Sequence, residues 1–192
     1  MTRKVMIVED ESLIAIDLQF ILEDNGYEVV AHAKNGETAI ELAHLYRPQL
    51  ILMDIKMPKL DGLKASKIIE QQFGIPILFI SAYSEKELLS YMKQDNVLGY
   101  VMKPFSEKNV LPALEVAFHQ IEKFDRLNGK LLQAQHQMEK RKVIERAKGL
   151  LMQLENISED QAYKRIRNES MRTQQEMVQI AQQILNTQQV NS

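Results

Sequence analysis

The chain has 192 residues, with 24 Lys+Arg against 26 Asp+Glu, a formal net charge of −2 and no cysteine. That length provides for one domain with a full hydrophobic core plus a smaller module, and the missing cysteine excludes disulfides and thiolate metal sites. No apolar run approaches the length of a membrane span, and the run near the N-terminus is too short for a signal peptide. A cytoplasmic protein without membrane contact is therefore expected.

Short apolar runs alternate with helical patterns over the first two-thirds of the chain. Strands are expected at residues 4–8, 27–33, 50–53, 77–80 and 100–102. Helices are expected from Ser12 to the Asn25-Gly26 stop, from Gly36 to just before Pro48, and over residues 63–73 and 85–93. This alternation predicts an α/β fold with a five-stranded parallel, doubly wound sheet.

Polar residues stand where these strands end, namely Glu9, Asp10, Asp54, Ser81 and Lys103. Right-handed crossovers bring such ends to one rim of the sheet, where open α/β folds bind ligands. Three neighbouring carboxylates repel one another unless a cation neutralises them, and Mg²⁺ prefers oxygen ligands. Because a carboxylate can attack a phosphoryl group, Asp54 is the predicted phosphoacceptor. The simpler alternative is a solvated loop aspartate.

Four separated motifs carry a resemblance to a known family. They are IVEDES, ILMDIKMPKLDG, ILFISAYS and GYVMKPF, and they occur in that order at compatible spacing. Residues 1–120 thereby resemble the receiver domain of two-component response regulators. The resemblance implies a flavodoxin-like fold, a cognate sensor histidine kinase as partner and Mg²⁺ as cofactor. It implies that the protein has no enzymatic activity other than slow removal of its own phosphoryl group.

The resemblance also implies a role for each residue of the rim. Metal binding falls to Glu9, Asp10, Asp54 and the backbone carbonyl of Lys56. Contact with the phosphoryl group falls to Ser81 and Lys103, with Tyr100 as an aromatic switch residue. The alternatives are a receiver that binds no phosphate, and a Tyr100 that only packs against its neighbours.

A long helix is expected to run on from the receiver through residues 106–138. Its 3-4-3-4 spacing is typical of a coiled coil. The spacing predicts a parallel homodimer whose seam contains Leu114, Ala117, Ile121, Phe124, Asn128, Leu131, Gln135 and Met138. The alternative is one amphipathic helix that packs on its own domain.

Residues 139–192 are predicted to form a small three-helix, all-α domain. A capping box is expected at Ser158–Gln161, and Thr173 is expected to cap the last helix. The segments VIERAKGLLM, SEDQAY, ESM and VQIAQQIL are similar to the ANTAR module of AmiR- and NasR-type antitermination regulators. That module binds RNA, so the similarity implies RNA hairpins that overlap a terminator as the ligand.

The candidates for RNA contact are basic or aromatic residues of this last segment: Arg141, Lys142, Arg146, Lys148, Tyr163, Lys164, Arg165, Arg167 and Arg172. Cations of this kind suit phosphates, and an aromatic ring suits a splayed base. For each cation the simpler interpretation is a solvated helix face, and for Tyr163 it is a place in the core.

The leading hypothesis is a phosphorylation-activated response regulator. It would dimerise on activation, bind RNA hairpins in nascent transcripts and prevent transcription termination. The alternatives are a DNA-binding transcriptional response regulator and one that sequesters a protein, although no helix-turn-helix pairing is evident. ANTAR regulators with intact receivers also resemble those of ethanolamine-utilisation systems.

Overall fold

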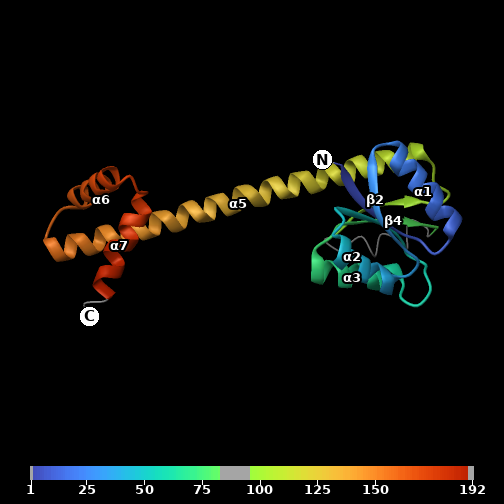
Figure 1. Ribbon diagram of the computed structural model, residues 1–192, viewed down its shortest axis with the longest axis horizontal. Helices are drawn as coiled ribbons and strands as arrows, with labels where there is room; N and C mark the ends of the chain where they lie inside the picture. Colours follow the sequence, from blue (N-terminus) through green and yellow to red (C-terminus); the bar gives the residue numbers. More distant parts are fainter. Residues whose placement is uncertain (1, 83–95, 190–192) are drawn as a thin grey trace. The chain divides into compact units, whose positions relative to one another are not determined.

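The computed structural model describes residues 2–82 and 96–189 and divides into two compact units, Met1–Phe124 and Asp125–Ser192. The first unit holds a five-stranded sheet in the order β2-β1-β3-β4-β5, in which every neighbouring pair is parallel. The predicted doubly wound α/β fold is therefore confirmed (Figure 1). The strands are β1 (Arg3–Val8), β2 (Tyr27–Ala33), β3 (Leu50–Asp54), β4 (Ile77–Ser81) and β5 (Val97–Met102).

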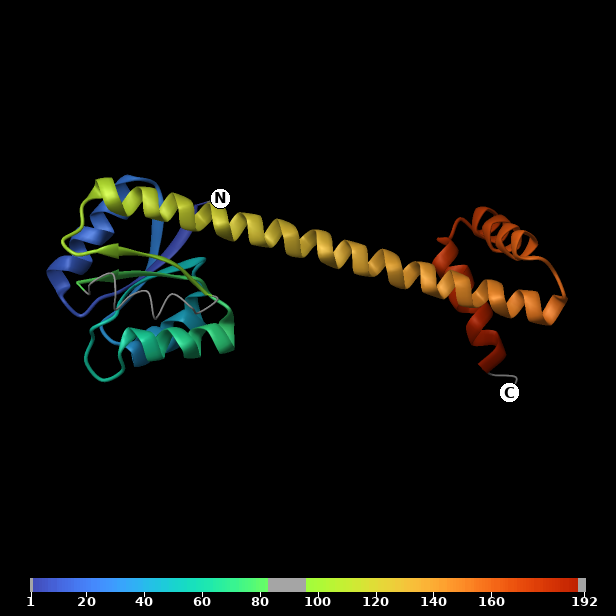
Figure 2. The same cartoon turned by 180° about the vertical axis from the view of Figure 1, so that it is seen from behind.

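Helices cover both faces of this sheet. On one face lie α1 (Ser12–Asp24) and the first turns of α5 (Glu107–Glu155), and on the other lie α2 (Gly36–Tyr46) and α3 (Gly62–Phe73) (Figures 1 and 2). Every residue of β3 is buried, as expected for a strand covered from both sides. The helix expected at residues 85–93 lies outside the described residues.

Two elements differ in extent from the prediction. Strand β5 begins at Val97 rather than at Tyr100, and its register against β4 shifts between Ile77 and Leu78. The shift interrupts the regular pattern by which a strand is recognised in a sequence. Helix α5 runs without interruption from Glu107 to Glu155, because its interior glycines, Gly129 and Gly149, each cost a helix only about 1 kcal/mol relative to alanine.

The second unit packs α6 (Glu159–Thr173) and α7 (Met177–Gln189) against the C-terminal part of α5. Its small core contains Ala147 and Leu151 from α5 with Ala162, Ile166, Ile180 and Ala181. The predicted capping box is confirmed, since Ser158 and Gln161 exchange hydrogen bonds with each other's backbone N–H. None of the described helices is both long and apolar enough to cross a membrane.

The predicted cap at Thr173 is wrong. Thr173 is the last residue of α6, and its hydroxyl donates to the carbonyl oxygen of Glu169, 2.8 Å away. A threonine hydroxyl can bond back to the preceding turn as readily as it caps a following one. Gln174 then adopts a left-handed conformation with φ 55° and ends the helix, and α7 starts only at Met177.

The N-terminal part of the predicted dimer seam is also corrected. Leu114 and Ala117 are 0% and 1% exposed, because they pack into the core between α5 and the sheet. Ile121 is partly buried against the same core. The 3-4 spacing of these residues therefore reflects packing within one unit, and the Leu114 and Ala117 side chains are not available to a second copy.

A polar and aromatic cluster fixes the start of α5 to the strands. Tyr27 donates a hydrogen bond of 2.6 Å to Glu115, and the Arg3 guanidinium lies 2.7 Å from Glu115 and 3.2 Å from Glu122. The Phe118 ring stacks on Tyr27 with centroids 5.6 Å apart, and the Arg3 guanidinium lies 4.8 Å from its centroid. Burial and the hydrogen bond to Glu115 raise the pKa of Tyr27 to about 12.

This raised pKa gives a testable pH dependence. The folded state holds the phenol proton more tightly than the unfolded state, so the contribution of Tyr27 to stability is complete below pH 10. It is lost as pH rises from 10 to about 12, by about 2–3 kcal/mol in the free energy of unfolding. Between pH 9 and 12, the free energy of unfolding from denaturant titrations should fall less steeply for Tyr27→Phe than for the wild type. Tyr46→Phe, at an exposed tyrosine, should decline like the wild type, and equal slopes for all three proteins would contradict the assignment.

Candidate functional site

The polar rim expected from the sequence is assembled at the carboxyl ends of the central strands. Asp54 is the last residue of β3, the middle strand, and Glu9 directly follows β1 beside it. Ser81 ends β4, and Lys103 follows β5. Asp10, Glu11, Asp54, Lys56, Ser81, Ala82 and Lys103 line a pocket of about 330 Å³ at this rim.

Lys103 is the electrostatic centre of the pocket. Its ammonium lies 2.6 Å from Asp54 Oδ2 and 2.8 Å from Glu9 Oε2, and its side chain is only 13% exposed. Burial alone would lower the pKa of Lys103, but the hydrogen bonds to the two carboxylates outweigh it and raise this pKa above the ordinary value. Lys103 is therefore a fixed positive charge directed at Asp54.

Glu9 is the most deeply buried carboxylate of the site, at 1% exposure. Burial raises the pKa of Glu9, and the ion pair with Lys103 opposes that rise. Glu9 Oε2 is enclosed, and within residues 2–82 and 96–189 its contact is the ion pair with the Lys103 ammonium, 2.8 Å away. Such an oxygen favours a further positive charge beside it.

The loop after β3 holds Asp54 in place through close backbone contacts. Gly62 donates from its N–H to the carbonyl oxygen of Ile55 at 2.9 Å, and a Cβ at Gly62 would lie 2.2 Å from the carbonyl oxygen of Asp54. Only glycine fits there. Asp61 accepts a hydrogen bond from the backbone N–H of Lys64 and caps α3. The turn sequence thus fixes where the phosphoacceptor candidate lies.

The three carboxylates have the geometry and charge that suit a divalent cation. Glu9, Asp10 and Asp54 each offer an oxygen within 4.8 Å of the others. The carboxylates of Glu9, Asp10 and Asp54 outnumber the Lys103 ammonium that pairs with them, so the cluster keeps a local excess of negative charge. Mg²⁺ takes one or two carboxylates with carbonyl and water oxygens, so this donor set fits it.

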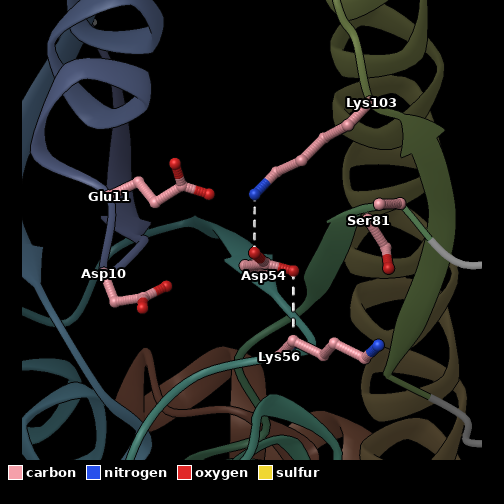
Figure 3. A pocket seen from close by; sticks show the side chains of 7 residues that line it. Asp10, Glu11, Asp54, Lys56, Ser81 and Lys103 are labelled. Carbon is pink, nitrogen blue, oxygen red and sulfur yellow. Dashed lines mark hydrogen bonds and ion pairs between the residues drawn. The ribbon is translucent and has the colours of Figure 1, made fainter.

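Figure 3 shows how the remaining site residues lie around Asp54. Asp10 and Glu11 lie on one side of Asp54 and Ser81 on the other, while the backbone N–H of Lys56 donates to Asp54 Oδ1 at 3.2 Å. Ser81 is buried, at 1% exposure. Tyr100 is half-buried and packs against the core on the α2–α3 face of the sheet.

Most basic candidates of the second unit are already paired with acids. Lys148 is the extreme case: its ammonium lies 2.9 Å from Glu145 and 2.7 Å from Glu159, and its side chain is 8% exposed. It therefore connects α5 to the first turn of α6. Four others form exposed ion pairs: Lys142 with Glu139, Lys164 with Asp160, Arg165 with Glu155, and Arg172 with Glu169.

The other candidates are available to a ligand. Arg141, Arg146 and Arg167 are exposed and form no ion pair within residues 2–82 and 96–189. The Tyr163 side chain is 41% exposed, so it is not part of the core that the simpler interpretation assigned to it. Within the described residues, four of the nine candidates present an unpaired cation or an exposed ring, and the exposed ion pairs of Lys142, Lys164, Arg165 and Arg172 leave those cations able to exchange their partner for a phosphate.

Comparison with known proteins decides the family. A model described as the response regulator receiver domain matches residues 5–115, more than half of the chain, and an ANTAR domain model matches residues 132–185. The chain belongs to the response regulators. This response regulator is 37% identical over 185 residues to "Transcriptional regulatory protein PdtaR" of Mycobacterium tuberculosis, which covers 96% of this chain and 90% of that protein.

Two further relatives match the receiver domain. Chemotaxis protein CheY of Bacillus subtilis is 35% identical over 115 residues, 59% of this chain and 96% of that protein. The receiver domain of a modulated diguanylate cyclase from Desulfovibrio desulfuricans G20 superposes with a TM-score of 0.58 and 32% identity. It covers 64% of this chain and 98% of that structure. The resemblances to the receiver and ANTAR families are therefore confirmed.

Two residues of this response regulator escaped the sequence analysis. Glu11 lines the pocket beside Asp10, and its place in the acidic run Glu9-Asp10-Glu11 was the available signal. Leu127 of α5 is the second such residue. It is 52% exposed, and the predicted seam contained its neighbour Asn128 instead. Residues 127, 131, 134 and 138 also follow 3-4 spacing and are all apolar, so apolarity would have selected Leu127.

Proposed function

We propose that this response regulator receives a phosphoryl group on Asp54 and that phosphorylation controls RNA binding by its ANTAR domain. The observation that carries the proposal is the position of Asp54. It is central among the strand ends, 2.6 Å from a buried ammonium and within 4.8 Å of two further carboxylates. An ordinary surface aspartate has no such surroundings.

The proposed reaction is a phosphoryl transfer from a sensor histidine kinase. The P–N bond of a phosphohistidine breaks, its electron pair stays on the imidazole, and a P–O bond forms to a carboxylate oxygen of Asp54. The Lys103 ammonium would form an ion pair with a phosphoryl oxygen, and the Ser81 hydroxyl would donate a hydrogen bond to another phosphoryl oxygen. Mg²⁺ held by Glu9, Asp10, Asp54 and the Lys56 carbonyl would neutralise charge on the phosphoryl group.

Phosphorylation would change the ion pairs that Lys103 forms at the rim of the sheet. Lys103 now bridges Asp54 and Glu9, and a phosphoryl group on Asp54 offers it more strongly negative oxygens. Ser81, at the end of β4, would turn toward the same group. Tyr100 lies on the neighbouring strand and is half-buried, and its ring would move inward as the switch residue.

The output would be a homodimer that presents two ANTAR domains to RNA. The α5 residues that suit a seam are apolar and exposed in the single chain: Leu127, Leu131 and Met138 are 52%, 56% and 60% exposed. Phe124, Asn128 and Gln135 of the predicted seam are exposed as well. Pairing two domains raises the effective concentration of the second for a neighbouring hairpin.

Arg141, Arg146, Arg167 and Tyr163 would supply the RNA contacts. Arginine binds phosphate through two parallel N–H groups, and a tyrosine ring stacks on an unpaired base. RNA hairpins that overlap a terminator combine both features, since their loops expose bases between charged strands. Binding there would favour the form of the transcript that is not terminated.

The test compares an RNA hairpin with duplex DNA of equal length, at two salt concentrations. The hairpin is first selected from a pool with randomised loops. A strong preference for the hairpin that persists at the higher salt supports the proposal. Equal and steeply salt-dependent binding to both would reduce the interaction to charge alone and contradict it.

A further inference from the structure

Gly149 occupies an unusual position for a glycine. It lies inside α5, six residues before the helix ends at Glu155, where glycine destabilises a helix relative to alanine. A Cβ at Gly149 would meet no atom of the described residues within 4 Å. The packing of the described unit therefore gives no reason for the absence of a side chain at residue 149.

The surface beside Gly149 is positively charged. Met138, Arg141, Lys142, Glu145 and Arg146 line a shallow groove on α5 just before it. Lys142 pairs with Glu139 and Glu145 pairs with Lys148, so these charges cancel. Arg141 and Arg146 form no ion pair within the described part of the chain and give the groove its net positive charge.

The helix geometry places both arginines close to Gly149. At 100° and 1.5 Å per residue, Arg146 lies about 60° around the helix and about 4.5 Å along it from Gly149. Arg141 lies about 80° around and about 12 Å along. Their side chains therefore start on either side of the face that contains Gly149, and Glu145, which lies between them one turn before Gly149, is paired with Lys148.

We infer that Gly149 is the point at which the sugar-phosphate backbone of an RNA comes closest to α5. The inference rests on the proposed RNA-binding function and identifies the contact surface within it. Without a side chain at residue 149, the nucleic-acid chain reaches the helix surface, as glycines permit where a backbone meets a phosphate group. Arg141 and Arg146 then both reach phosphates of the same strand.

Charge selects RNA over another occupant. A partner α5 that continued the seam past Met138 would bring its own Arg141 and Arg146 against these two arginines, which form no ion pair within the described residues, so like charges would repel and the seam is expected to end at Met138. A polyanion neutralises them instead. Lys148 takes no part, because its ammonium is held by Glu145 and Glu159.

The experiment is Gly149→Ala in the full chain, with two measurements on the same sample. Alanine fits the open space and favours the helix, so the melting temperature should rise by about one to a few degrees. The added methyl group keeps the phosphate backbone away from α5, so the dissociation constant for the selected RNA hairpin should rise at least about tenfold. A purely structural role for Gly149 predicts a fall in melting temperature.

Gly129→Ala is the matched control. Gly129 is also an interior glycine of α5, and a Cβ there would likewise meet no atom within 4 Å in the part of the chain that the structure describes. The melting temperature of Gly129→Ala should rise by about as much as that of Gly149→Ala, while its affinity for the hairpin should equal that of the wild type.

Four results would overturn the inference. They are unchanged hairpin affinity in Gly149→Ala, a lowered melting temperature, an altered dimerisation constant without loss of RNA affinity, and an equal loss of affinity in Gly129→Ala. If no hairpin binds to the wild-type protein, the proposed RNA-binding function itself fails and the inference falls with it.

Discussion

Asp54→Asn is expected to abolish phosphorylation by acetyl phosphate in the presence of Mg²⁺. The amide lacks the nucleophilic oxygen, and no other carboxylate of the site lies at the centre of the strand ends with Lys103 at 2.6 Å. Mass spectrometry of the intact protein should show the phosphorylated species in the wild type and less than about one-hundredth of it in the variant, a change of more than about 2.7 kcal/mol in the barrier. The fold should persist, since Lys103 keeps its ion pair with Glu9.

The control for this variant is Asp17→Asn. Asp17 is an exposed aspartate of α1, and its substitution changes the net charge by the same amount. It should be phosphorylated at the wild-type rate. Persistent phosphorylation of Asp54→Asn would show that another residue accepts the phosphoryl group, and the assignment of Asp54 would be wrong.

Leu131→Glu is expected to prevent dimerisation along α5. Leu131 is 56% exposed in the single chain and lies between Leu127 and Met138 on one stripe of the helix. In a coiled coil its side chain would be enclosed by the partner helix, and a buried, unpaired carboxylate there costs several kcal/mol. Sedimentation of the phosphorylated protein should show the dimer dissociation constant raised by at least about a hundredfold.

Leu132→Glu is the control for this second variant. Leu132 is 65% exposed but lies about 100° around the helix from Leu131, outside the stripe. It should dimerise like the wild type. Equal loss of the dimer in both variants would indicate a general effect of charge on α5, and unchanged dimerisation in Leu131→Glu would contradict the proposed seam.

Much of the receiver fold could be predicted because its signals are local. The fully apolar run Leu50–Met53 followed by Asp54 predicts a buried strand with a carboxylate at its end, and the structure contains that strand. Strand β5 was predicted too short because its register shift depends on the neighbouring strand. Thr173 was assigned to the wrong helix because its hydroxyl suits either end.

The side-chain environments of the site could not be predicted in the same way. Sequence placed Glu9, Asp54 and Lys103 at strand ends, but the ion pairs that join them depend on the order of the strands in the sheet. In the second unit, Lys148 and Arg146 look alike in the sequence. Only the fold shows that two carboxylates hold the Lys148 ammonium, while Arg146 forms no ion pair within the described residues.

The seam prediction failed at its start for a related reason. Leu114 and Ala117 follow the same 3-4 spacing as Leu131 and Met138, since one helical period serves a domain core and a coiled coil equally. The pattern does not mark where the receiver ends. Burial marks it, because the apolar side chains of α5 pass from enclosed at Ala117 to exposed at Leu127.

The central claim is that the phosphoryl group on Asp54 controls RNA binding, and one measurement tests it directly. The dissociation constant for the selected hairpin is measured with Mg²⁺, with and without acetyl phosphate, for the wild type and for Asp54→Asn. We expect the wild type to bind at least about tenfold more tightly when phosphorylated and the variant to show no change. Equal affinity of the wild type in both conditions, or the same gain in Asp54→Asn, would contradict the account.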